Sequence, residues 1–255
     1  MNLTIDIGNS VIGLALVADG EVVEAYSVET RKAEQLDFYL VTFKNLLGDY
    51  IKKDIVKGAI IASVVPRLTL MIKEAVTRLF NVTPLIVGPG VKNGLVLKVD
   101  HPLEVGADIV ACGVGAYKFG SGPFIIIDLG TANKYIYVDD KRVFHGVAIS
   151  AGLKVAFEGL VQSADQLLIV PFVMPNKVLG KNTKDALASG ALNGLLSEMN
   201  GFVSLIKEEV GGNPQVLLTG GNALYIQDYV DKSFKYIPHL VHYGLNEILV
   251  KNYAK

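Results

Sequence analysis

This chain of 255 residues has almost no excess of charge of either sign, and it has little cysteine. Lys and Arg number 24 against 25 Asp and Glu, so the formal net charge is −1. That balance gives no electrostatic case for binding nucleic acid or an anionic membrane. The single cysteine, Cys112, excludes an internal disulfide and fits a reducing compartment. It lies in an apolar stretch with no neighbouring histidine, and we interpret it as a buried small hydrophobe.

Long apolar runs and linker-like segments are absent as well. Acidic residues such as Glu104, Asp108 and Asp165 interrupt the longest runs, so none approaches the ~18 residues that a membrane span needs. Asp6 stands where a signal peptide would be apolar, and we expect a cytoplasmic protein with no membrane partner. Hydrophobic residues nevertheless make up 51% and mean hydropathy is +0.39. This excess suggests that part of the surface is covered in an oligomer.

One short phrase occurs twice. Residues 4–10 read Thr-Ile-Asp-Ile-Gly-Asn-Ser, and residues 126–133 read Ile-Ile-Asp-Leu-Gly-Thr-Ala-Asn. Their aspartates, Asp6 and Asp128, lie 122 positions apart (128 − 6), close to half of the chain. A repeat of that period indicates two similar folded halves, because solenoid units are far shorter.

The repeated phrase suits phosphate binding. A strand that ends at Asp and turns through Gly exposes backbone N–H groups, and nearby small hydroxyls add donors. The carboxylate can hold a hydrated Mg²⁺ beside the phosphate. Two such turns facing each other would bind a nucleoside triphosphate, although a single Asp-x-Gly turn would mean little.

The order of predicted elements repeats with the phrase. Each half is expected to run strand, strand, strand, helix, strand, helix, strand, with a turn at Asp19-Gly20 in the first half and at Asp139-Asp140 in the second. The predicted strands cover 3–6, 11–17, 21–28, 58–65 and 84–87, then 124–128, 135–138, 142–149, 215–219 and 234–237, and the first-half helices cover 33–50 and 66–80. A helix is also predicted after Gly220-Gly221.

This order is that of the actin-like ATPase (ribonuclease H-like) fold, an α/β architecture of two βββαβαβ halves with an ATP cleft between them. We expect the halves to cover residues 1–100 and 101–255. The second half holds about 34 extra residues by the spacing from Asp6 to Ser63 and from Asp128 to Thr219 (91 − 57). Most of them fall in 160–182. Such insertions often carry substrate-specific parts.

Six motifs together resemble one family, the type III pantothenate kinases. They are Asp6-x-Gly8-Asn9-Ser10, Ala62-Ser63-Val64-Val65-Pro66, Pro102-x-Glu104-Val105-Gly106-Ala107-Asp108, Asp128-x-Gly130-Thr131-Ala132, Gly180-Lys181-Asn182-Thr183 and Leu218-Thr219-Gly220-Gly221. The resemblance runs nearly end to end. It implies ATP-dependent phosphorylation of pantothenate at the start of coenzyme A synthesis.

The resemblance also implies roles for the residues. Asp108 would be the base that receives the proton of the attacking hydroxyl, although an Asp at a helix start is also common for the helix dipole alone. Gly106, Ala107 and Thr183 would contact substrate. Thr183 has a plainer reading, as part of a helix start capped by Asn182.

The nucleotide and cation sites follow in the same way. The ATP cradle would comprise Asp6, Gly8, Asn9, Ser10, Gly13, Gly130 and Thr131, with Mg²⁺ near Asp6. Asp128 would be the metal ligand for a monovalent cation, K⁺ or NH₄⁺. The family also implies a homodimer, with the substrate pocket near the subunit interface.

Several family residues are replaced here. Ile109 follows Asp108 where the family has an arginine that contacts substrate, and Asn133 and Lys134 stand where it has two threonines. His101 replaces the asparagine before Pro102, and residues 146–152 depart from the family's Gly-Gly-x-Ile-x-Pro-Gly. Besides a pantothenate kinase, the sequence therefore leaves open a kinase of a different small alcohol, or a non-catalytic regulatory paralogue that binds nucleotide.

Lys134 suggests a specific consequence. Side chains alternate along a strand, so Asp128 at the end of one strand and Lys134 at the start of the next can face the same side. A lysine ammonium is a compact point charge. We hypothesise that it replaces the bound potassium ion; the alternative is that Lys134 points to solvent.

Overall fold

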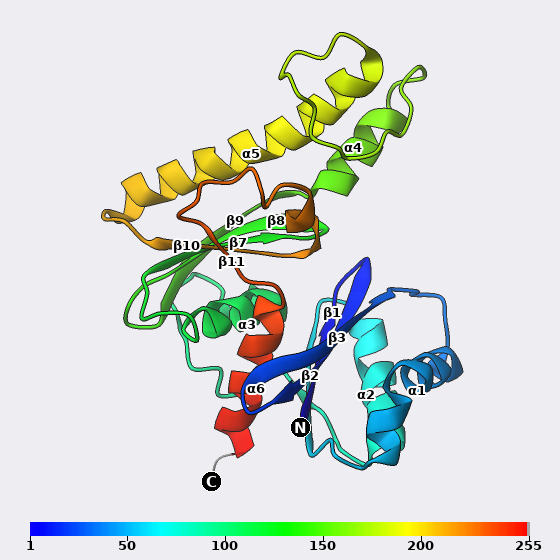
Figure 1. The fold of residues 1–255 in the computed structure, drawn as a ribbon. Helices are drawn as coiled ribbons and strands as arrows, with labels where there is room; N and C mark the ends of the chain where they lie inside the picture. Colours follow the sequence, from blue (N-terminus) through cyan, green and yellow to red (C-terminus); the bar gives the residue numbers. More distant parts are fainter. Residues whose placement is uncertain (254–255) are drawn as a thin grey trace. The chain divides into compact units, whose positions relative to one another are not determined.

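A computed structural model describes residues 1–253. The described residues form two compact units, one built from residues 1–120 and 239–253 and the other from residues 121–238 (Figure 1). Each unit has a sheet of its own, and each is described separately below.

The first unit is a five-stranded sheet covered by helices on both faces. Its strands are β1 (Asn2–Ile7), β2 (Val11–Ala18), β3 (Glu21–Glu29), β4 (Gly58–Ser63) and β5 (Leu85–Ile86), in the order β3-β2-β1-β4-β5. Helices α1 (Leu36–Lys52) and α2 (Pro66–Phe80) pack on one face, and α3 (Ala107–Ala116) and α6 (Leu240–Tyr253) pack on the other. Because side chains alternate along a strand, Ile61 faces α1 and α2 while its neighbours Ile60 and Ala62 face α3 and α6.

The last helix returns to the first unit, where it crosses α3 closely. Gly244 of α6 allows this approach, since a Cβ at that position would lie 1.7 Å from the carbonyl oxygen of Ala111 in α3. This packing keeps α3 with the first sheet, so the compact units divide at residues 120 and 238 rather than at the expected boundary after residue 100. The short β6 (Val96–Leu97) and a 3₁₀ turn at Pro102–Glu104 connect β5 to α3.

The second unit repeats the strand order of the first. Its strands are β7 (Phe124–Leu129), β8 (Ala132–Val138), β9 (Val143–Ala151), β10 (Gln215–Thr219) and β11 (Lys235–Tyr236), in the order β9-β8-β7-β10-β11. The helices are α4 (Leu153–Gln162) and α5 (Thr183–Val210), and α5 buries Leu192, Met199 and other residues against β7, β8 and β10. The matching order confirms the predicted duplicated α/β fold.

Two differences from the predicted elements stand out. The helix expected after Gly220-Gly221 is wrong: the structure has only a short 3₁₀ segment, Gly221–Tyr225. Helix α6 was not predicted, because its apolar side chains can be recognised as a packing face only from their contacts with α3 and the first sheet. Within residues 1–253 no helix combines the length and apolar character that a bilayer crossing requires.

Candidate active site

Asp128 and Lys134 form an ion pair on adjacent strands of the second unit. The register of β7 and β8 places the two residues directly opposite each other. Lys134 Nζ lies 2.6 Å from Asp128 Oδ2, and each side chain is only 16% exposed. The expectation that both face the same side is confirmed, and the alternative of a lysine pointing to solvent is wrong.

The turn that follows Asp128 is held by two neighbouring segments. The backbone N–H of Gly152, after β9, donates to the carbonyl oxygen of Thr131 at 3.0 Å. Asn222, in the 3₁₀ segment after β10, donates to the carbonyl oxygen of Gly130 at 2.7 Å through Nδ2. These bonds hold the backbone of the turn, and the Thr131 side chain is exposed.

Asp6 occupies the equivalent place in the first unit. It lies opposite Gly13 across the β1–β2 ladder and beside Ala62 of β4, as Asp128 lies opposite Lys134 and beside Thr219. Gly13 brings no side chain here. The space beside it is taken by His242 of α6, since a Cβ on Gly13 would lie 3.0 Å from His242 Nε2.

His242 is buried and neutral. Burial, and to a smaller extent the nearby His239, lower its pKa to about 3. Its Nδ1 lies 2.8 Å from the hydroxyl of the buried Thr4, which also donates to the carbonyl oxygen of Ala15 at 3.2 Å. The imidazole therefore fills the position opposite Asp6 without adding charge.

The turn of the first unit, Gly8–Ser10, is contacted by the segment that follows β3. The backbone N–H of Thr30 donates to Ser10 O at 2.9 Å, and the Thr30 hydroxyl donates to Gly8 O at 2.8 Å. Lys32 Nζ donates to Asn9 Oδ1 at 2.8 Å. Thr30 and Lys32 were missed from the sequence, because nothing local shows that residues 30–32 return to the turn.

Asp108 lies in the first turn of α3, as predicted. Gly106 precedes the helix as its N-cap residue, and a Cβ there would lie 2.5 Å from Asp108 Oδ1. Gly106 is thus required for the carboxylate to take this position. The following residue, Ile109, is buried, at 6% exposed.

Thr183 is the first residue of α5 and is exposed. Asn182 is its N-cap, and the Asn182 side chain accepts a bond from the Asp185 backbone N–H at 2.9 Å. The capped helix start is confirmed. A substrate contact through Thr183 stays a prediction.

A polar cluster, which the sequence did not indicate, lies on the opposite side of β8 from Lys134. Glu198 of α5 accepts bonds from Asn133 Nδ2 at 3.3 Å and from the Tyr135 hydroxyl at 2.7 Å, and also from the Ser150 hydroxyl. Burial and the Glu198 carboxylate raise the pKa of Tyr135. The cluster joins β8 and β9 to α5 and so steadies the strand that carries Lys134.

The predicted residues fall into two groups. The first unit carries the candidate base and one turn, with residues Asp6, Gly8, Asn9, Ser10, Gly13, Gly106, Ala107 and Asp108. The second unit carries the other turn and the helix start, with residues Asp128, Gly130, Thr131 and Thr183.

Comparison with known proteins gives a consistent family. The family model described as type III pantothenate kinase matches residues 2–205. A type III pantothenate kinase from Exiguobacterium sp. is 36% identical over 253 residues, which cover 99% of each chain. Among solved structures, one described as a Baf family transcriptional activator from Campylobacter jejuni has a TM-score of 0.61 at 18% identity, covering 98% of both chains. A structure named as a 2-dehydro-3-deoxygalactonokinase from Sinorhizobium meliloti has a TM-score of 0.55 at 14% identity, covering 100% of both chains.

Proposed function

The chain belongs to the type III pantothenate kinase family, and from this premise we propose that it transfers the γ-phosphoryl group of ATP to the hydroxyl of pantothenate. The product is 4′-phosphopantothenate, and the step is the first of coenzyme A biosynthesis. Full-length similarity to a type III pantothenate kinase, at 36% identity, is the observation that carries this conclusion. A cytoplasmic location suits an enzyme that consumes ATP.

Asp108 is proposed as the general base. Phosphoryl transfer needs mainly positioning and charge stabilisation, so a carboxylate that orients the attacking hydroxyl in line and takes its proton is sufficient. Support comes from the Gly106–Asp108 geometry, since a Cβ at residue 106 would lie 2.5 Å from Asp108 Oδ1 and would shift this carboxylate. Gly106 and Ala107 would contact the substrate beside it.

The two Asp-x-Gly turns are proposed to bind ATP. Asp6, Gly8, Asn9, Ser10 and Gly13 would serve from the first unit, and Gly130 and Thr131 from the second. Mg²⁺, when bound, neutralises phosphate charge. Asp6 suits it, because carboxylate oxygens are the ligands that Mg²⁺ prefers and the residue opposite, Gly13, brings no competing cation.

A substrate panel tests the proposed function. ADP formation by the purified chain is measured with pantothenate and with other small alcohols, and pantothenate is expected to be turned over. Turnover with another alcohol alone would favour a different kinase, a reading that the buried Ile109 supports. Nucleotide binding with no turnover on any substrate would favour a regulatory paralogue.

We further propose that Lys134 replaces the monovalent cation. Its ammonium already lies 2.6 Å from Asp128 Oδ2, so this oxygen does not fit a potassium ion at the same time. Both side chains are only 16% exposed, so the pair is weakly screened by salt. A fixed ammonium would then supply the charge that K⁺ or NH₄⁺ would otherwise bring to Asp128.

Thermal unfolding tests this replacement without relying on turnover. A ligand that binds only the folded state raises the melting temperature. We expect potassium to stabilise the Lys134→Thr variant relative to a large inert cation, and to leave the native chain unchanged. Potassium stabilisation of the native chain, or none in Lys134→Thr, would contradict the replacement.

A homodimer is also proposed, with Thr183 near the substrate of the same or the neighbouring subunit. The insertion before α5 exposes several apolar side chains, including Leu168, Ile169 and Leu179, which are 75%, 77% and 84% exposed. Along α5, Gly190 and Gly194 have open space where a Cβ would stand. Light scattering at micromolar concentration should give the dimer mass, and a monomer would count against the proposal.

A further inference from the structure

The segment after β3, residues 30–34, is docked on the Gly8–Ser10 turn at several points. Thr30 donates two bonds to this turn, one from its backbone N–H to the carbonyl oxygen of Ser10 and one from its hydroxyl to the carbonyl oxygen of Gly8. A third bond, from Lys32 to the Asn9 side chain, sets an ammonium beside the same turn. All three partners belong to the first unit.

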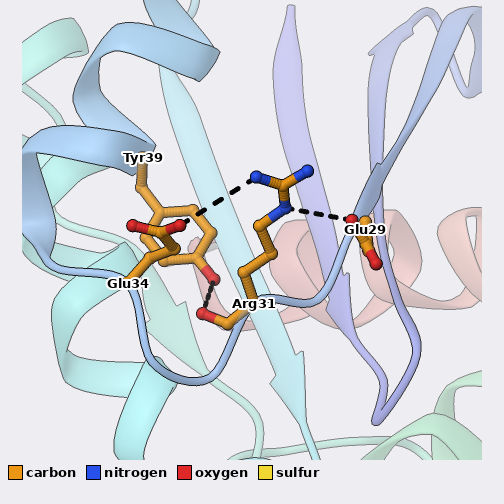
Figure 2. Close-up of polar contacts among 4 residues, drawn as sticks. All are labelled: Glu29, Arg31, Glu34 and Tyr39. Carbon is orange, nitrogen blue, oxygen red and sulfur yellow. Dashed lines mark hydrogen bonds and ion pairs between the residues drawn. The ribbon is translucent and has the colours of Figure 1, made fainter.

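The docked segment is also bonded to a buried residue of α1. Figure 2 shows the Tyr39 hydroxyl, which donates to the carbonyl oxygen of Arg31 at 2.9 Å. Tyr39 is fully buried, so it ties the segment to the core of the first unit. The Arg31 guanidinium points between Glu29 and Glu34, with Nε 3.0 Å from Glu29 Oε2 and Nη1 3.9 Å from Glu34 Oε1 (Figure 2).

These contacts give the two basic side chains different roles. The Arg31 guanidinium forms ion pairs with two carboxylates, which compensate its charge. Lys32 is exposed and bonded to a neutral amide oxygen, 2.8 Å away. Its positive charge is therefore not compensated by Asn9 and can be redirected to a phosphate oxygen at low cost.

We propose that Lys32 is a nucleotide-binding residue that donates to the terminal phosphates of ATP. The inference rests on the proposed function, because it takes the Gly8–Ser10 turn as the phosphate site. Backbone N–H groups of such a turn bind phosphate oxygens. An ammonium tethered to Asn9 lies at the rim of that site, where a bond to a charged phosphate is stronger than one to a neutral amide.

Thr30 acts as a positioning residue for this lysine. Its hydroxyl and backbone N–H hold residues 30–32 against the turn, so the ammonium stays close to the phosphate site before ATP arrives. A side chain held near its bound position loses less conformational freedom on binding. Thr30→Val would keep the shape of the side chain but remove the bond to Gly8 O.

Nucleotide binding by variants tests the inference. The dissociation constants of ATP and AMP are measured for the native chain, for Lys32→Ala and for Lys44→Ala, a matched loss of one exposed lysine from α1. We expect Lys32→Ala to weaken ATP binding about 10-fold, as for the loss of a charged hydrogen bond, with AMP binding nearly unchanged. Lys44→Ala should leave both constants unchanged.

The outcomes separate this inference from the proposed function. Unchanged ATP binding by Lys32→Ala, with the native chain binding ATP, would overturn the role of Lys32 and leave the kinase standing. Equal weakening in Lys44→Ala would show a general charge effect and would also overturn it. No ATP binding by the native chain would instead reject the proposed function. Lys32→Arg keeps the charge, and we expect it to retain most of the affinity for ATP.

Discussion

The two units place an aspartate at the same point of the same strand order, yet its surroundings differ in charge. In the first unit Asp6 lies opposite Gly13, beside which the neutral His242 ring is buried. In the second unit Asp128 lies opposite Lys134 and is paired with it at 2.6 Å. Duplication thus preserves the position of the carboxylate, whereas the residue across the ladder differs: a glycine in the first unit and a paired lysine in the second.

This difference agrees with the distinct roles that we propose for the two carboxylates. A carboxylate whose opposite residue brings no charge is suited to a hydrated Mg²⁺. A carboxylate already paired with an ammonium has little further need of a cation. Three changes test this difference: one at Asp108 in the first unit, one at the two aspartates, and one at the buried His242 of the first unit.

The largest effect is expected from Asp108→Asn in the first unit. Asn keeps the shape and removes the proton acceptor, so turnover should fall about 10²–10⁴-fold while ATP binding stays nearly intact. Steady-state rates and a nucleotide titration measure the two quantities. The matched control is Asp37→Asn, because Asp37 is an acidic residue in the first turn of α1. An unchanged rate in Asp108→Asn would mean that Asp108 serves only the start of α3.

The next effect distinguishes Asp128 from Asp6. Asp128→Asn leaves the 16%-exposed Lys134 without its carboxylate, and we expect a loss of about 3 kcal/mol in unfolding free energy, as for a broken buried pair. Asp128→Asn combined with Lys134→Met should recover most of it. Asp6→Asn is the comparison variant, and a smaller loss is expected there because the residue across the ladder is Gly13 rather than a lysine. Chemical denaturation followed by circular dichroism gives these values, and equal losses at the two aspartates would break the comparison.

The smallest effect concerns pH and His242. Its pKa is about 3 in the folded chain against 6.5 for an ordinary histidine, so the unfolded state binds the proton more tightly. Stability from this group is complete above about pH 6.5 and is lost as pH falls toward 3. Between pH 7 and pH 5 the loss should be about 2 kcal/mol.

His242→Leu isolates that contribution. The Thr4 hydroxyl keeps its bond to Ala15 O, so the variant leaves no buried donor unpaired. Unfolding free energies of both proteins are compared at pH 7 and pH 5. The native chain should lose about 2 kcal/mol more than the variant over this interval, and equal losses would show that His242 is protonated in the folded state.

The order of strands in both units could be predicted from the sequence, because each strand is indicated by residues that are close together in the chain. The repeated Asp-x-Gly phrase and the alternation of apolar residues define the strands that end at Asp6 and Asp128. That Asp128 and Lys134 face the same side followed from the alternation of side chains along the two strands; their direct pairing across the ladder is a finding of the structure. The capping of α5 by Asn182 followed from residue type and spacing.

Contacts between distant segments could not be read in this way. His242 reaches Thr4 from 238 positions away, and Glu198 reaches Tyr135 from 63 positions away. Neither contact shows a local pattern, because the partners come from segments that are far apart in the sequence. The helix predicted after Gly220-Gly221 was wrong because it was inferred from the element order of the first half. The segment itself forms only a 3₁₀ turn.

The central claim is a pantothenate kinase whose second aspartate is neutralised by its own lysine. The most direct measurement is the initial rate of ATP-dependent pantothenate phosphorylation by the native chain, at equal ionic strength in potassium chloride and in tetramethylammonium chloride. Equal rates in the two salts are predicted, because Lys134 supplies the charge at Asp128. A rate that collapses without potassium would contradict the built-in cation, and no rate in either salt would contradict the kinase.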